Sequence, residues 1–113
     1  MARKTKAAGK PRKIADKPMD AAQQALFNRA LQHVKTSYRR KDDLAEVMQG
    51  FAEEEGCYLD KACGAGLTCI TLSHKEIPGS VVVSAIGSKR IMVSAHGNDK
   101  HEILRERHYK VQA

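Results

Sequence analysis

Apolar residues recur at helical spacing over the first part of the chain that has a regular pattern. They form a single stripe made of Leu26, Phe27, Ala30, Leu31, Val34 and Tyr38. Asp20 can cap this helix, and Gln23 stands where a capping box has Glu or Gln. We therefore predict a helix that begins at Asp20 and carries Arg39, Arg40 and Lys41 in its last turn, where cations suit the helix dipole.

A second helical pattern follows almost at once. Its apolar residues are Leu44, Val47, Met48, Phe51 and Ala52. Asp43 and Glu46 form another capping-box pattern, and Gly56 can end the helix in the left-handed conformation. The acidic residues 53–55 would form either a solvated helix end or a docking point for a basic partner or for the tail of this chain. The short joint between the helices predicts an angled pair or a hairpin.

After Gly56 the helical spacing is lost. Residues 57–66 are small and irregular, and they predict no regular element. Three β-branched or apolar runs predict strands at residues 67–74, 80–86 and 90–95. Pro78-Gly79 is typical of a type II turn, and Gly87-Ser88 of a tight hairpin. We expect a three-stranded antiparallel meander, with Val81, Val82 and Val83 supplying much of its buried face.

Residues 99–111 fit two patterns. Asp99 with Glu102 is a third capping-box pattern, and Ile103, Leu104, Arg107 and Val111 fit a short helix. The alternation Ile103, Arg105, Arg107, Tyr109 and Val111 fits a strand less well. We predict a helix, which gives the order ααβββα and an α+β fold with helices packed on one face of a small sheet.

Most of the positive charge lies at the N-terminus. The chain has a net charge of +7, and residues 1–18 alone carry +6. The seven cations of this tail, opposed by Asp16 alone, are Arg3, Lys4, Lys6, Lys10, Arg12, Lys13 and Lys17. Like charges with few large apolar residues predict a disordered tail, so we place one α+β domain at residues 19–113.

Three features bear on the compartment. There is no apolar run of the length that a membrane span needs, and no apolar segment of a secretory signal near the N-terminus. The odd number of cysteines favours free thiols in a reducing compartment. We expect a cytoplasmic protein without membrane contact, and the basic tail leaves association with the nucleoid or the nucleus open.

The cysteines do not predict a metal site. Cys57, Cys63 and Cys69 are each separated by five residues, and His74 follows after four more. Structural zinc sites use closer pairs, which aim two thiolates at one ion. The chain also has no nucleophile elbow or other catalytic pattern, and Gly64-Ala65-Gly66 precedes a strand where a phosphate cradle would follow one. We predict no metal, no cofactor and no enzymatic activity.

The basic residues suggest a nucleic-acid partner. The tail cations, joined by Lys35, Arg39, Arg40 and Lys41 at the joint of the helices, could contact phosphates without reading sequence. Tyr38 completes the apolar stripe and is expected in the core, and the second helix is too acidic to enter a groove. We expect a non-enzymatic nucleic-acid-associated protein. The alternative is a small protein-binding regulator or inhibitor that acts through its folded domain or an exposed strand edge, with the tail serving only solubility.

Overall fold

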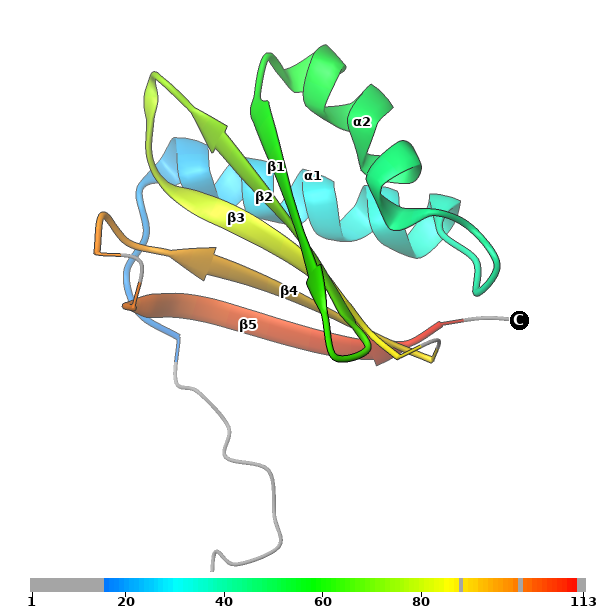
Figure 1. Ribbon diagram of the computed structural model, residues 1–113. Helices are drawn as coiled ribbons and strands as arrows, with labels where there is room; N and C mark the ends of the chain where they lie inside the picture. Colours follow the sequence, from blue (N-terminus) through cyan, green and yellow to red (C-terminus); the bar gives the residue numbers. More distant parts are fainter. Residues whose placement is uncertain (1–15, 88, 100, 112–113) are drawn as a thin grey trace, which may run out of the picture.

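Two helices precede five strands in the chain. The structure, a computed structural model, describes residues 16–111 except 88 and 100. Its elements are α1 (Ala21–Ser37), α2 (Leu44–Glu55), β1 (Tyr58–Gly64), β2 (Leu67–His74), β3 (Ile77–Ile86), β4 (Arg90–His96) and β5 (Ile103–Lys110). The strands form one antiparallel meander in the order β1-β2-β3-β4-β5, and both helices lie on one of its faces (Figure 1). The α+β class is confirmed, whereas the predicted three-stranded meander and C-terminal helix are wrong.

The predicted helix starts are confirmed by their caps. The carboxylate of Asp20 accepts a hydrogen bond from the backbone N–H of Ala22, and that of Asp43 accepts one from Ala45, each at 2.9 Å. Gly56 ends α2 with a φ of 71°, the left-handed conformation that favours glycine. The apolar residues that these two helices bury are Leu26, Phe27, Ala30, Val34, Leu44, Met48, Phe51 and Ala52, all from the predicted stripes.

The strand register places the core on the helix-facing side of the sheet. Ile70, Val83 and Val93 form one row across the middle strands, and Leu72, Val81 and Ala95 form the next. All six are fully buried, because α1 packs on β3 and β4 while α2 packs on β1 and β2. Val82 alternates with its neighbours and points to the other face, so only two of the three predicted valines line the core. The rows continue onto the edge strand β5 at Arg107 and Arg105.

The strand β1 was missed because its residues carry no apolar alternation. Within Tyr58–Gly64 all side chains except that of Leu59 are exposed. As the edge of the sheet, β1 forms through its backbone pairing with β2. Gly64-Ala65-Gly66 makes the hairpin turn between the two strands, with positive φ at Ala65 and Gly66.

The predicted C-terminal helix is replaced by β5. Asp99 does accept a backbone hydrogen bond, from His101 at 3.0 Å, but it closes a turn and caps no helix. Gly97 N–H then donates to Glu102 O, and the chain returns antiparallel to β4. An aspartate can accept the N–H two residues later either as the cap of a helix or in a turn, and this explains why a helix was predicted here.

Gln23 and Pro78-Gly79 also differ from their predicted roles. Gln23 does not close a capping box: its side chain is buried, and its Nε2 donates to the carbonyl oxygens of Ser80 at 3.1 Å and His96 at 2.8 Å. Pro78 and Gly79 lie inside β3, and the β2–β3 turn falls before them, at residues 75–76. Gly79 has a φ of 74°, and a Cβ there would overlap His96 O and Gln23 Nε2.

Candidate nucleic-acid interface

The C-terminal end of α1 leads into a loop that carries three of the predicted phosphate-binding residues. Lys35 lies in the last turn, whereas Arg39, Arg40 and Lys41 follow the helix, so their predicted place in its last turn is wrong. Asp42 causes the early end: its carboxylate accepts the N–H of Arg39 at 2.8 Å, and its own N–H donates to Arg39 O at 3.0 Å. The guanidinium of Arg39 folds back towards the carbonyl oxygens of residues 36 and 38. Lys35 and Arg39 therefore do not share a helical face.

Two tyrosines connect this loop to the end of β5. Tyr38 is buried, as predicted, and caps α1 by donating its N–H to Val34 O. Tyr109 projects from the helix-facing side of β5, and Nζ of Lys35 lies 5.6 Å from its ring centroid, a cation–π contact. Burial raises the pKa of Tyr109 to about 12, with a further rise from Tyr38 and an opposing effect of the nearby Arg39. The loop and the end of β5 are therefore electrostatically coupled.

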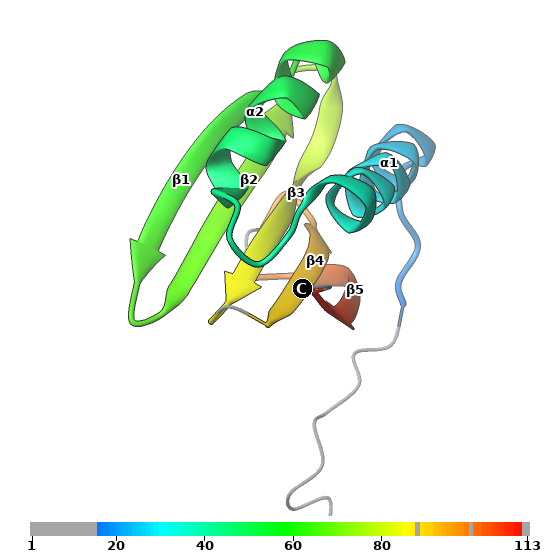
Figure 2. The ribbon, with the colours of Figure 1, turned by 90° about the vertical axis from the view of Figure 1, so that its right-hand side faces the viewer.

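The structure adds three cations that are distant in sequence. Arg90 at the start of β4 pairs in register with Lys110 at the end of β5, and Lys89 O accepts the N–H of Val111 at 2.7 Å. The β3–β4 turn, the end of β5 and the α1–α2 loop lie at the same end of the molecule (Figure 2). We call the exposed cations of this region the basic end: Lys35, Arg39, Arg40, Lys41, Lys89, Arg90 and Lys110.

Sequence reasoning missed Lys89, Arg90 and Lys110. The predicted Gly87-Ser88 hairpin placed the first two at an end of the sheet, but the position of Lys110 depends on the strand β5. Arg90 and Lys110 alternate with the core residues Ile91 and Tyr109, so they start from the sheet face opposite the helices. The basic end therefore surrounds the end of the sheet from both sides.

The cations of the basic end are not held in ion pairs within the described part of the chain, although the carboxylates of Asp42 and Asp43 lower the net positive charge of the loop. Among residues 16–87, 89–99 and 101–111, none of its seven cations forms an ion pair. The carboxylates of Asp42 and Asp43, which are close in sequence, accept hydrogen bonds from backbone N–H groups. The arrangement can therefore attract a polyanion at a water-exposed surface.

The acidic end of α2 has a partner within the domain. Arg29 of α1 donates to both carboxylate oxygens of Glu55, at 2.8 and 2.7 Å. This bidentate pair fixes α1 against α2 and raises the pKa of Arg29. Glu53 and Glu54 stay exposed, so the solvated helix end that we considered applies to them but not to Glu55.

The predicted tail residues fall almost entirely outside the described part of the chain. Those outside it are Arg3, Lys4, Lys6, Lys10, Arg12 and Lys13. Lys17 is described: its N–H donates to Leu104 O at 2.8 Å, and its Nζ lies 3.9 Å from a carboxylate oxygen of Glu102. Leu104 and Lys110 are separated by about 20 Å of strand, so Lys17 lies well away from the basic end. The predicted disorder of residues 1–18 stays a prediction for residues 1–15.

The cysteines are dispersed. All three are free, and Cys63 and Cys69 project from opposite faces of the sheet, since Cys63 pairs with Thr68 and Cys69 with Ala62. Burial and the neighbouring Glu55 raise the pKa of Cys57, which Arg29 opposes. In the described ranges no three His, Cys, Asp or Glu side chains are grouped to hold a metal ion.

No protein family, curated protein or solved structure compared with the chain matches it. No helix of the described residues is long and apolar enough to cross a membrane.

Proposed function

We propose that this protein binds nucleic acid without catalysing a reaction, and that it contacts phosphates through its N-terminal tail together with the basic end. One observation carries the proposal: seven exposed cations without an ion pair, from separate parts of the described chain, lie together at one end of the molecule. Each cation that neutralises a phosphate releases condensed counterions, and this gain in entropy drives binding. Such contacts do not distinguish base sequences.

The tail provides a second group of cations on the same chain. Residues 1–15 contain six Lys or Arg residues and no Asp or Glu. A basic segment linked to a basic surface raises the effective concentration of each for the same polyanion. We therefore infer that the tail supplies most of the affinity and that the basic end supports it.

Binding should depend steeply on salt and weakly on sequence. Full-length protein is titrated into labelled duplexes of unrelated sequence and into single-stranded RNA, and anisotropy is followed at several salt concentrations. We expect similar affinities for all duplexes and a log–log salt slope on the order of −4 to −6. Removal of residues 1–15, which keeps Asp16 and Lys17, should flatten the slope by about four. The truncated domain should keep its thermal midpoint.

A protein-binding role is favoured by the exposed edge of the sheet. The strand β1 lies at this edge with unpaired backbone groups along its outer side, and Tyr58 at its start is 68% exposed. An extended peptide could add a strand there. If full-length protein binds neither DNA nor RNA at low ionic strength, the nucleic-acid proposal fails and this alternative takes its place.

A further inference from the structure

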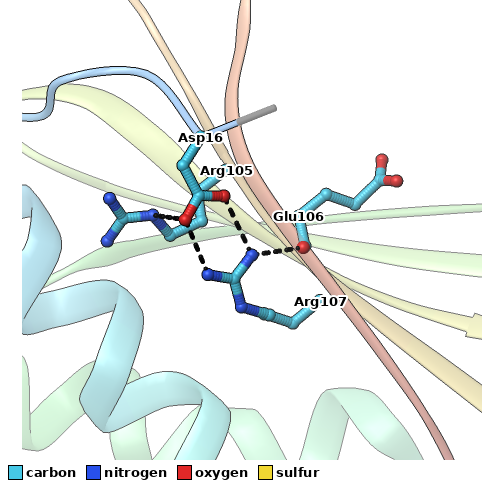
Figure 3. Close-up of polar contacts among 4 residues, drawn as sticks. All are labelled: Asp16, Arg105, Glu106 and Arg107. Atoms are coloured by element: carbon cyan, nitrogen blue, oxygen red, sulfur yellow. Dashed lines mark hydrogen bonds and ion pairs between the residues drawn. The ribbon is translucent and has the colours of Figure 1, made fainter. Parts of the chain in front are cut away.

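A carboxylate from the tail occupies a pair of arginines on β5. Nη1 and Nη2 of Arg107 lie 3.0 and 2.8 Å from the two carboxylate oxygens of Asp16, a bidentate pair (Figure 3). Nε of Arg105 lies 3.5 Å from Oδ2 of the same carboxylate. Asp16 is the only acidic residue among residues 1–18. The one negative group of the tail is thus held by two arginines of the domain.

The two arginines belong to the helix-facing side of the sheet, in the rows of the core. Arg105, Arg107 and Tyr109 alternate along β5 on this side, and Lys35 lies over Tyr109. The side chain of Arg107 is exposed, whereas that of Arg105 is largely covered and only 16% exposed. Tyr109 continues the row from these arginines towards the basic end. An extended polyanion could therefore follow β5 from one group of cations to the other.

Asp16 fills this arginine pair incompletely. The side chains of Arg107 and Asp16 are 44% and 43% exposed, so water competes with their contact and the ion pair is weak. Nε of Arg105 is buried and has no hydrogen-bond acceptor in the described part of the chain, since 3.5 Å from Asp16 is too far for a good hydrogen bond. The oxygens of a phosphate group suit two guanidinium forks better than one carboxylate does.

We propose that Arg105 and Arg107 form a phosphate-binding site, which Asp16 occupies as an internal competitor until a nucleic-acid backbone displaces it. This inference rests on the proposed function, and it identifies a further contact of that interface.

Neutralising the competitor should strengthen binding. At about 0.1 M salt, each additional phosphate that the protein neutralises is expected to raise affinity about eightfold through counterion release. Full-length Asp16→Asn should therefore bind a short duplex about tenfold more tightly and steepen the salt slope by about one to two. Glu102→Gln is the matched control: it removes the same charge beside Lys17 without freeing either arginine, and it should leave the slope unchanged.

A double-mutant cycle separates the site from simple charge. Arg107→Gln should weaken binding little in the wild-type background, because Arg107 is already occupied, but it should abolish the increase in affinity of Asp16→Asn. If Asp16→Asn is indistinguishable from Glu102→Gln, or binds more weakly than wild type, the carboxylate is a structural anchor and the inference is overturned.

Inorganic pyrophosphate tests the site without nucleic acid. In ¹⁵N spectra of the arginine side chains, the Nε–Hε signals of Arg105 and Arg107 in Asp16→Asn should shift on titration, and higher concentrations should be needed in wild type. Arg29, held by Glu55, should not shift. If the signals of Arg105 and Arg107 do not shift on titration, the proposed phosphate-binding site is overturned. If the signals shift while full-length protein binds no DNA or RNA, the anion site stands and the proposed function fails.

Discussion

At the scale of single residues, the hydroxyl of Tyr109 is one of two buried side-chain groups that lack a hydrogen-bond partner in the described part of the chain, the other being Nε of Arg105. Burial raises the pKa of this tyrosine to about 12. The ring contacts Lys35, and that contact needs no hydroxyl. The ring therefore contributes a contact to the interface, while the unpaired hydroxyl destabilises the folded state.

Tyr109→Phe should be as stable as wild type near neutral pH, or more stable by up to about 1 kcal/mol, because it removes an unpaired buried hydroxyl. The folded state holds the tyrosine proton more tightly than the unfolded chain, whose pKa is about 10. The raised pKa of Tyr109 therefore contributes to the free energy of unfolding of wild type. This contribution is complete below about pH 10 and is lost as the pH rises through 12.

Urea unfolding at about pH 7 and between about pH 10 and 12 checks this prediction. The midpoint of wild type should fall more steeply over the alkaline range than that of Tyr109→Phe, with a remaining fall from Tyr38, whose pKa burial also raises. Tyr58→Phe, at an exposed side chain, is the control and should behave as wild type. A loss of more than about 1 kcal/mol in Tyr109→Phe at neutral pH would show that the hydroxyl is bonded.

At the scale of elements, the N-terminal turn of α1 is fixed to the sheet through one buried amide. Gln23 is 2% exposed and bonds to backbone oxygens of β3 and β4, while Gly79 leaves room for its side chain. Because both acceptors are carbonyl oxygens, the position requires a donor. A donor at this position sets where α1 crosses the sheet.

Gln23→Glu should be destabilised by at least about 3 kcal/mol at neutral pH, because a buried carboxylate would face two carbonyl oxygens. The pKa of such a glutamate would be raised in the folded state. In the folded state the protonated form, which can donate one hydrogen bond, is then favoured up to this raised pKa. The loss of stability should be smallest below about pH 4, where the unfolded chain is protonated as well, and should grow as the pH rises through the raised pKa. Gln24→Glu introduces the same charge on the same turn at an exposed position and should be neutral or slightly stabilising. Urea unfolding of both variants at neutral pH and at about pH 4 tests this prediction. Equal losses of unfolding free energy in Gln23→Glu and Gln24→Glu would refute the role of Gln23.

At the scale of the whole molecule, the charge is distributed asymmetrically. The basic end lies where α1 finishes and α2 begins, whereas Glu53–Glu55 lie at the other end of α2, next to the start of β1. An asymmetric charge distribution orients a protein towards a polyanion before contact and speeds association.

Neutralising the basic end should weaken nucleic-acid binding more than neutralising an equal charge elsewhere. We expect Arg90→Gln with Lys110→Gln to flatten the salt slope by about one to two. The matched control, Lys61→Gln with Lys75→Gln, removes two exposed cations of β1 and the β2–β3 turn and should flatten it by less than half a unit or so. All four side chains are exposed, so the unfolding free energies should differ little. Equal slopes for both pairs would show that net charge alone matters.

The sequence by itself determined the helices, the three central strands and the separation of charge. Their signals are local, because Asp20, Asp43 and Gly56 act on backbone groups within one turn, and buried stripes repeat every few residues. Most of the tail cations can be read from composition alone, although their role stays a prediction.

Only the tertiary structure decided the two edge strands and the site. The residues of β1 are exposed and β5 fits both a helical and an alternating pattern, so each becomes a strand through its pairing with a neighbour. The contact of Lys35 with Tyr109, the bonds of Gln23 to distant carbonyl oxygens and the contact of Asp16 with Arg107 join residues far apart in sequence. Periodicity and capping report only on neighbouring residues, whereas these contacts depend on how a five-stranded sheet and two helices pack together.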